Sequence, residues 1–273
     1  MQDASEFRTI HQIIKKAKQN LNQNLWDYVI GGSSTETTLK RNRAAIDARA
    51  LQPKVLNDVS NVDTSATVVG QKLTMPVVLA PIGSLQNIVE GGGATAAIAA
   101  EEAGIMSISS SVCDPILEDI AAASHAPKIF QLYVRGDADW TDDIVQRAVD
   151  SGFKAFCLTV DSAVVSRRER DIAKGVQPTS RPIAGHGSMG FQETLNWSDV
   201  ARIKKKFNIP LIIKGIFRAD DALKALDHGV DVVYVSNHGG RQIDQGLGAL
   251  DLLSDIVEAV NGQAEIIVDG GFY

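Results

Sequence analysis

The chain has 273 residues, of which 44% are hydrophobic and 22% charged, and its formal net charge is −6 at pH 7. This length suits one α/β barrel or two average domains, and the composition is that of a globular protein with a large core. The acidic balance argues against a general nucleic-acid binder, which usually carries a basic excess. We therefore expect small molecules or further copies of the chain as partners.

Targeting and metal-binding signals are absent from the sequence. Residues 1–6 contain neither the basic nor the apolar region of a secretory signal. The apolar stretches are strand-sized, so no membrane span is predicted. The two cysteines, Cys113 and Cys157, have no CxxC or His-rich spacing, which indicates reduced thiols and no metal site. Together these features favour a cytoplasmic protein.

The first elements are predicted to be helical. Apolar residues recur at helical spacing from Phe7 to Leu21, and two glycines provide a stop after residues 26–30. A polar, arginine-rich stretch follows from Lys40 to Arg49. Residues 66–69 and 71–74 flank Gly70, a pattern that predicts a short hairpin.

From residue 76 onward, short Val- and Ile-rich runs alternate with helical patterns, which indicates βαβ units and a parallel sheet. The seven predicted strands are 77–82, 105–109, 128–134, 155–161, 211–216, 232–237 and 265–270. The predicted helices between them are 93–103, 115–124, 141–151, 197–207, 219–228 and 250–261. Residues 172–194, with several Gly and Pro residues, predict one long loop after the fourth strand, where a lid or specificity element is common.

Polar residues occur in the C-terminal part of strand after strand, from Ser109 on the second to Asp269 on the seventh. A (β/α)₈ barrel assembles its site from all its strand ends, whereas a doubly wound sheet gathers polar groups at one switch point. We therefore predict an α/β fold, a (β/α)₈ TIM barrel with an N-terminal helical segment. It forms a single domain over 1–273, with helices and hairpin at 1–75 and barrel strands one to seven at 76–273.

The eighth strand and the final helices of such a barrel are missing from this pattern. An open remnant would expose two unpaired strand edges, which complete barrels avoid. We therefore expect an incomplete barrel in a C-terminally truncated chain, most simply a fragment of a longer protein.

The residues best suited to chemistry follow the sixth strand, in the heptad Ser236-Asn237-His238-Gly239-Gly240-Arg241-Gln242. Its two glycines allow a tight turn, so that a histidine and an arginine share one loop. Histidine is a natural general base near neutral pH, and the arginine fork suits a carboxylate. This pair suits proton abstraction from a 2-hydroxy acid; the alternative is a structural histidine beside a surface arginine.

The heptad resembles the signature of the FMN-dependent 2-hydroxy-acid dehydrogenases and oxidases, which include glycolate oxidase, lactate oxidase, mandelate dehydrogenase and flavocytochrome b2. The similarity extends from about Leu25 to Gly271. Its supporting segments are 27–28, 79–83, 131–133, 158–161 with 167–168, 213–215 and 268–271. The resemblance implies FMN as cofactor, an (S)-2-hydroxy acid such as lactate or glycolate as substrate, oxygen or another electron acceptor, and a homo-oligomer, with a tetramer as the family form.

The resemblance also implies a role for individual residues. His238 would be the base, Asp161 would orient it, and Tyr133 would hydrogen-bond the substrate oxygen. Arg168 and Arg241 would bind the substrate carboxylate, assisted by Tyr28. The cofactor would contact Pro81, Ile82, Gly83, Ser109, Gln131, Thr159, Lys214, Ser236, Asp269, Gly270 and Gly271, with Lys214 beside the electron-rich edge of the reduced flavin. Gly83 would leave extra room near the flavin, where some relatives carry alanine.

Two family features lie beyond the last residue, Tyr273: an arginine after the Asp-Gly-Gly segment and a Gly-Arg pair on the eighth strand, which bind the FMN phosphate. We therefore expect the 273-residue chain alone to bind FMN poorly and to show little activity. An inactive truncated fragment is one alternative, and another FMN-binding TIM-barrel enzyme, which would not need the His238–Arg241 pair, is a second. The α-hydrogen could leave as a proton or as a hydride.

Overall fold

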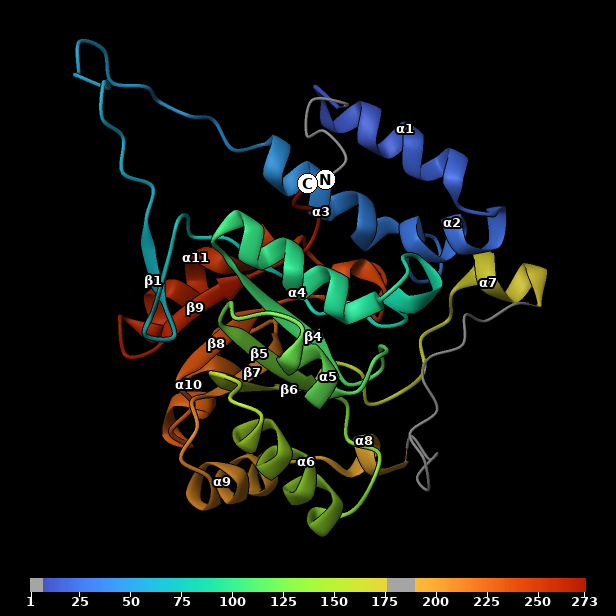
Figure 1. Cartoon of the computed structure of the whole chain (residues 1–273), viewed down its shortest axis with the longest axis vertical. Coiled ribbons are helices and arrows are strands. Elements are labelled where there is room, and N and C mark those ends of the chain that lie inside the picture. The colour runs from blue at the N-terminus through green and yellow to red at the C-terminus, as the bar shows by residue number, and fades with distance from the viewer. Residues whose placement is uncertain (1–6, 176–189) are drawn as a thin grey trace.

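The computed structural model describes residues 7–175 and 190–273, and Figure 1 shows their arrangement. Three helices come first: α1 (Ile10–Asn20), α2 (Gln23–Ile30) and α3 (Thr37–Asp47). The Thr9 hydroxyl and the Asn22 side chain cap the first two by accepting hydrogen bonds from backbone N–H groups. The third occupies the arginine-rich stretch to which the sequence assigned no element.

A hairpin connects these helices to the barrel. Strands β1 (Ala66–Val68) and β2 (Gln71–Leu73) pair antiparallel, and Gly70 turns between them at a φ of +67°. The hairpin expected around Gly70 is therefore confirmed. Leu73 is buried in the apolar cluster inside the sheet, so the hairpin closes one end of the barrel interior.

The main sheet of the described residues has seven parallel strands in the order β3-β4-β5-β6-β7-β8-β9. Their bounds are β3 (Val78–Leu79), β4 (Met106–Ser110), β5 (Lys128–Leu132), β6 (Ala155–Thr159), β7 (Leu211–Ile216), β8 (Val232–Val235) and β9 (Glu265–Val268). Each strand pairs with its neighbour in sequence, and no reversal of order creates a switch point. This order is that of a curled barrel sheet and confirms the barrel over the doubly wound alternative.

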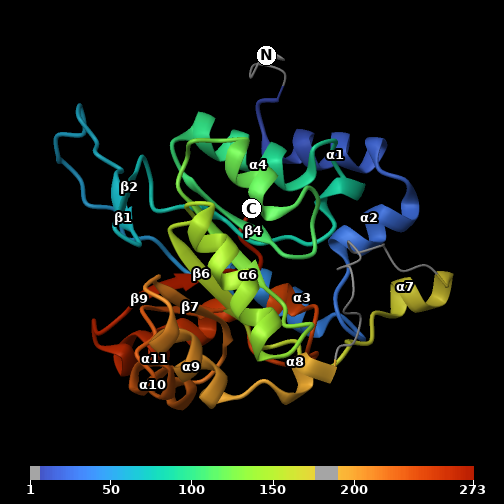
Figure 2. The same cartoon turned by 60° about the horizontal axis from the view of Figure 1, so that its bottom comes forward.

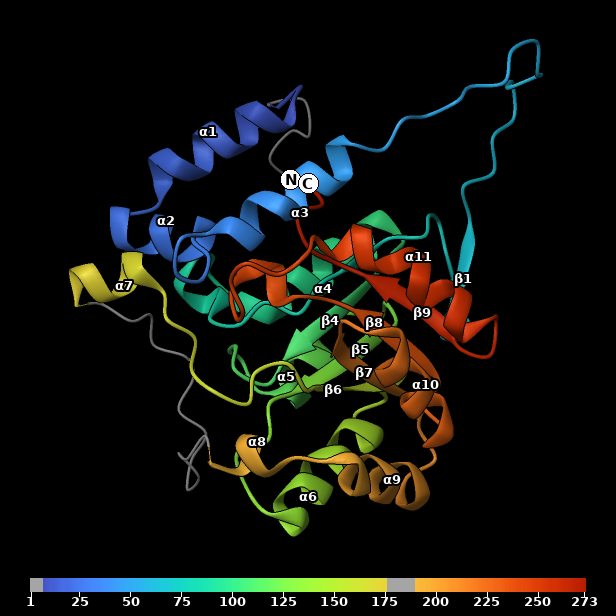
Figure 3. The ribbon, with the colours of Figure 1, turned by 180° about the vertical axis from the view of Figure 1, so that it is seen from behind.

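The six helices predicted between the strands are present and lie on the outer face of the sheet (Figures 2 and 3). They are α4 (Gly92–Ala103), α5 (Leu117–Ala122), α6 (Ala138–Asp150), α9 (Trp197–Lys206), α10 (Ala219–Asp227) and α11 (Ala249–Val260). Two short 3-10 helices, η1 (Leu85–Asn87) and η2 (His238–Gly240), follow strand ends.

The single loop predicted at 172–194 is partly wrong. Helix α7 (Glu169–Lys174) runs into its beginning and α8 (Gly190–Thr194) occupies its end, while residues 176–189 lie outside the described residues. The turn of α7 forms because its charged side chains pair with the N-terminal helices: Arg170 with Glu36 at 2.6 Å, and Lys174 with Asp27. Such long-range ion pairs leave no local signal in the sequence.

Strand alternation divides the core into two layers. On β6, Phe156 and Leu158 face the helices, whereas Ala155 and Cys157 face the barrel interior. Burial raises the pKa of the Cys157 thiol to about 12, so it stays protonated and acts as a core residue. Both cysteines are buried, and neither forms a disulfide within the described residues. In the described part of the chain, no helix is long and apolar enough to cross a bilayer.

Candidate active site

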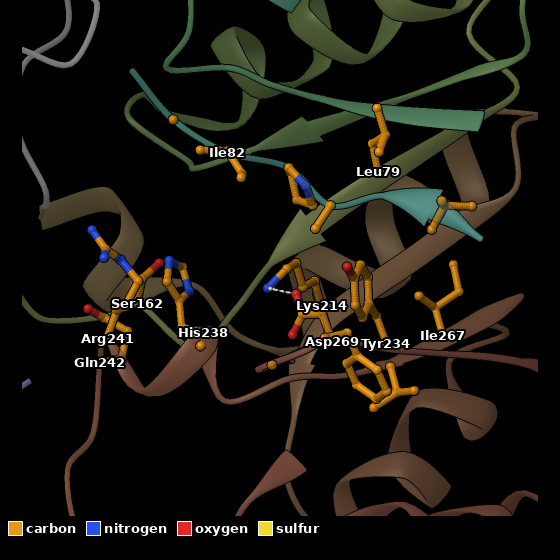
Figure 4. Close-up of a pocket in the computed structure, with 18 of the residues that line it drawn as sticks. Leu79, Ile82, Ser162, Lys214, Tyr234, His238, Arg241, Gln242, Ile267 and Asp269 are labelled. Atoms are coloured by element: carbon orange, nitrogen blue, oxygen red, sulfur yellow. Dashed lines mark ion pairs between the residues drawn. The ribbon is translucent and has the colours of Figure 1, made fainter. Parts of the chain in front are cut away.

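A cavity of about 1450 Å³ opens at the C-terminal ends of the strands and extends between β3 and β9 (Figure 4). Many of the residues expected from sequence to form the site line it: Tyr28, Pro81, Ile82, Gly83, Tyr133, Arg168, Lys214, His238, Arg241, Asp269, Gly270 and Gly271. The N-terminal helices and six strand ends therefore contribute to one cavity.

His238 lies between a carboxylate and a phenol. Its Nδ1 is 2.9 Å from Asp161 Oδ1, and its Nε2 is 3.2 Å from the Tyr133 hydroxyl. The backbone bends sharply to present the ring, because His238 has a φ of +56° and Gly239 and Gly240 follow at +65° and +74°. The His238 N–H also donates to Ser236 Oγ at 3.1 Å. The heptad thus forms a fixed turn that points the imidazole into the cavity.

Asp161 is held as an anion. Burial alone would raise the pKa of its carboxyl, but the charge and hydrogen bond of His238, together with Lys214, lower the pKa below its ordinary value. Gly215, at a φ of +109°, leaves the space that Asp161 occupies, since a Cβ there would lie 2.5 Å from the Asp161 Cβ. An ionised carboxylate on Nδ1 keeps the proton there and leaves Nε2 as the acceptor.

Lys214 places a buried cation on the floor of the cavity. Its Nζ donates to Ser236 Oγ at 2.7 Å and lies 3.2 Å from Asp269 Oδ2. Burial alone would lower the pKa of this ammonium, but Asp269 and Asp161 raise it above its ordinary value. Figure 4 shows Lys214 and Asp269 together beneath the cavity.

Two arginines flank the ring of Tyr28. The guanidinium carbons of Arg241 and Arg168 lie 4.8 and 5.7 Å from its centroid. Arg241 Nη1 donates to the carbonyl oxygens of Tyr28 at 2.7 Å and Gly31 at 2.8 Å, at the C-terminus of α2. Burial, and then the charge of Arg168, lower the pKa of Arg241. Two cations so close to each other favour a bound anion.

Asn42, a residue that the sequence did not single out, holds the heptad through Asn237. Asn42 on α3 and Asn237 exchange amide hydrogen bonds of 2.9 and 2.7 Å, and both are buried. Asn237 Oδ1 also accepts from Gly240 N–H, and Asn42 Oδ1 from Ala249 N–H. Asn42 further contacts the second glycine-rich turn, where a Cβ on Gly270 would lie 3.2 Å from its Oδ1. Figure 3 shows α3 beside α11 on this side.

The remaining candidates lie deeper or on the other face of the sheet. Gln131 Nε2 donates to Thr159 Oγ1 at 2.8 Å, and both residues are fully buried. Ser109 pairs in register with Phe130, on the helix side, whereas Ser110 pairs with Gln131. Ser110 is thus the serine of β4 that shares the interior face, by strand alternation.

The space next to Gly83 is limited by a neighbour. A Cβ added to Gly83 would lie 2.8 Å from Val112 Cγ2, so an alanine there needs a shift of the Val112 side chain. The expectation that this position leaves room beside the flavin stays a prediction.

The described residues fit a flavin. The Gln131 Oε1 and Asp269 Oδ1 atoms are buried acceptors without a hydrogen-bond partner in that part of the chain. Buried polar atoms of this kind normally find a partner, here one that a ligand can provide. An acceptor, a fixed cation and a large cavity together suit a flat, electron-accepting ring with N–H groups at its edge.

Comparison with known proteins identifies this arrangement. The FMN-dependent dehydrogenase family matches residues 17–273. An L-lactate oxidase from Nostoc is 35% identical, over 93% of this chain and 77% of its own length. The 2-hydroxyacid oxidase 2 of Homo sapiens is 36% identical, over 93% of this chain and 76% of its own length.

Solved structures agree with the sequence relatives. The crystal structure of a mandelate oxidase superposes with a TM-score of 0.90 at 31% identity, covering 97% of this chain and 79% of that one. Another mandelate oxidase structure, with a TM-score of 0.87, carries an FMN adduct. The chain belongs to the FMN-dependent dehydrogenase family, whose members are TIM-barrel flavoenzymes that act on 2-hydroxy acids.

Proposed function

We propose that this chain oxidises an (S)-2-hydroxy acid to the 2-oxo acid with His238 as the base. One observation carries the proposal: His238 Nε2 faces the cavity while Nδ1 is held by Asp161 at 2.9 Å. In this arrangement Nε2, which faces the Tyr133 hydroxyl at 3.2 Å, is the acceptor that takes one proton from the substrate. The buried Asp161 carboxylate then stabilises the imidazolium. FMN, when bound, would accept the two electrons of the oxidation together with the other hydrogen that the substrate loses.

The substrate carboxylate is bound by Arg241 and Arg168, with Tyr28 assisting. Arg241 is already oriented by the α2 carbonyl oxygens, so little side-chain freedom is lost on binding. The two guanidinium groups disfavour each other until an anion lies between them. This arrangement supports binding of a 2-hydroxy acid through its carboxylate, with its hydroxyl toward His238.

Tyr133 holds the substrate oxygen as a hydrogen-bond donor. Burial raises the pKa of its phenol above the ordinary value, so the hydroxyl stays protonated at physiological pH. The same hydroxyl lies 3.2 Å from His238 Nε2, which puts the base and the donor at one point.

The cofactor is bound by residues on both sides of the cavity. Lys214 stabilises negative charge on the reduced ring, which is a general function of a cation beside a flavin. The other proposed contacts are Gln131, Thr159, Ser236, residues 81–83 and residues 269–271, with Ser110 of the interior face in place of Ser109. Titration of the apoprotein with FMN, followed by flavin fluorescence, gives the dissociation constant of FMN. A weak affinity is expected for this chain alone, and substitution of the proposed contacts should weaken it further.

Oxygen is the proposed acceptor, because the relatives named above are oxidases. We further propose that the protein is a homotetramer and is located in the cytoplasm. Oxygen consumption coupled to hydrogen peroxide release, light scattering and cell fractionation test these three statements in turn.

Anaerobic mixing of the FMN-loaded protein with (S)-lactate, glycolate and (S)-mandelate tests the function itself. We expect bleaching of the oxidised flavin absorbance by at least one of them, and loss of bleaching in His238→Gln. Flavin that binds in the cavity but is reduced by no 2-hydroxy acid would refute the proposal and favour another FMN-dependent barrel enzyme.

A further inference from the structure

Arg135 is an arginine of the cavity wall that the proposed mechanism does not use. Its side chain is half-buried and lines the same cavity as His238 and Arg241. Among the described residues its Nε is buried without a hydrogen-bond partner. No carboxylate of that part of the chain lies close enough to affect its pKa, which burial lowers and to which Tyr133 contributes the only charge interaction.

The arginine is held at a defined place. Gln131, Tyr133 and Arg135 alternate along one face of β5 and its extension, so Arg135 continues the row that faces the interior. The preceding residue, Val134, donates its N–H to Gln192 Oε1 at 2.7 Å, and Gln192 Nε2 donates to Thr159 O at 2.7 Å. The α8 helix therefore fixes the backbone from which Arg135 projects.

A second unsatisfied group lines the same cavity. Ser162, directly after Asp161, is only 6% exposed, and its Oγ has no hydrogen-bond partner among the described residues. Ser162 lines the cavity, and Figure 4 draws it at the end occupied by His238 and Arg241. The sequence of 176–189 contains no Asp or Glu, so it offers no side-chain carboxylate to Arg135.

An unpaired guanidinium in a half-buried position is costly unless a ligand neutralises it. Arg241 and Arg168 already account for one carboxylate. We propose that Arg135, with the Ser162 hydroxyl, binds a second anionic group, so that the substrate is a 2-hydroxy dicarboxylic acid. This inference rests on the proposed function, because it assigns the far end of the same substrate.

Matched substrates test the inference. (S)-Malate and (S)-2-hydroxybutyrate have the same number of carbons and differ in the second carboxylate. We expect kcat/KM for malate to exceed that for 2-hydroxybutyrate by about 10- to 100-fold, the range of one charge-assisted hydrogen bond. (S)-2-Hydroxyglutarate against (S)-2-hydroxyvalerate repeats the comparison with one more carbon.

The variant Arg135→Met removes the cation and keeps the bulk of the side chain. It should lower kcat/KM for malate by about the same 10- to 100-fold, mainly through a higher KM. The kcat/KM for 2-hydroxybutyrate should stay unchanged. Arg135→Lys should retain part of the preference. Arg147→Met is the control, because it removes a cation that pairs with Glu118 outside the cavity. It should leave kcat/KM unchanged for both acids.

Equal kcat/KM for the two four-carbon acids in the wild-type protein would overturn the inference and leave the proposed function intact. An equal loss on both acids in Arg135→Met would also overturn it. If neither acid is turned over, calorimetric binding of oxaloacetate against 2-oxobutyrate decides the inference, while flavin reduction by lactate, glycolate or mandelate still decides the proposed function. Tighter binding of oxaloacetate that Arg135→Met abolishes supports the second anion site; equal binding refutes it.

Discussion

The central strands of the sheet and its two edge strands build different halves of the site. Every residue of β4, β5, β6, β7 and β8 is buried, whereas β3 is only partly buried and β9 has one exposed and three partly buried residues. The central strands lead to Tyr133, Asp161, Lys214 and His238. The edge strands lead to residues 81–83 and 269–271.

The two halves are also stabilised differently. In the central half the functional groups hold one another: Asp161 and Tyr133 contact His238, and Lys214 contacts Ser236. The edge turns rely on neighbours outside the sheet, Val112 at Gly83 and Asn42 at Gly270. Changes in the central half should therefore affect chemistry most, and changes at the edges should mainly affect stability.

The largest effect is expected for Asp161→Asn. A neutral amide can hold the ring but cannot stabilise the imidazolium or fix its tautomer, so flavin reduction should slow by about 10³- to 10⁴-fold. Anaerobic stopped-flow measurement of flavin bleaching gives the rate. Asp142→Asn is the control, because Asp142 bridges Arg202 and Lys206 away from the cavity. A loss below tenfold would contradict the assignment of Asp161.

Asp161 should also leave a signature in the pH dependence of stability. Its pKa is lowered in the folded protein, so its stabilising contribution is present above the unfolded value of about 3.9 and is lost as the pH falls through the folded pKa. Thermal unfolding of wild type and Asp161→Asn should show a Tm difference at pH 5–7 that narrows below about pH 4. A Tm difference that widens toward low pH would contradict a lowered pKa of Asp161 in the folded protein.

Lys214→Met removes the ion pair with Asp269, which joins the central strand β7 to the turn after the edge strand β9. It leaves the Asp269 carboxylate near a cavity floor without its cation, and breaking a buried pair in this way costs about 3 kcal/mol or more. Urea unfolding measures the loss. The double variant Lys214→Met, Asp269→Asn should recover part of it, because no unpaired charge remains. Equal stability of the single and double variants would show that the ion pair contributes little.

Asn42→Ala tests the contacts of helix α3 with Asn237 and with the edge turn at Gly270. It leaves the Asn237 amide partly unpaired, at a cost of about 1–3 kcal/mol. Hydrogen exchange should accelerate at the N–H groups of Gly240 and Ala249, which donate to this asparagine pair. Asn22→Ala, at the exposed cap of α2, removes an amide of the same size without touching either turn. Equal exchange in both variants would argue against a role of these contacts.

The features predicted correctly are those that depend on the local spacing of apolar and polar residues. Runs of Val and Ile predicted all seven strands, and polar residues at their ends predicted a shared site. Some strands were predicted too long, since β5 ends at Leu132 and β6 at Thr159, whereas 211–216 matches β7. Beyond these points the backbone leaves the ladder, which presents Tyr133 to the cavity and Asp161 to His238.

Helix α3 and the α7 contacts could not be predicted from apolar periodicity. The buried residues of α3 are Thr38, Asn42 and Ala45, which have helical spacing but are small or polar. A search for small and polar residues at helical spacing would have found them. Arg135 belongs to no motif, and its proposed role rests on the absence of a partner among the described residues, which a sequence does not display.

The smallest effect is expected for Gly83→Ala at the edge of the sheet. The new Cβ would lie 2.8 Å from Val112 Cγ2, and small overpacking of this kind costs about 1 kcal/mol where a neighbour can shift. The double variant Gly83→Ala, Val112→Ala should restore stability to that of Val112→Ala alone, because the clashing methyl is gone. FMN affinity and flavin reduction should change little in either variant, since the methyl presses on Val112 and the central half is untouched. A large loss of reduction rate with unchanged stability would instead place Gly83 against the reacting atoms and break the division between edge and centre.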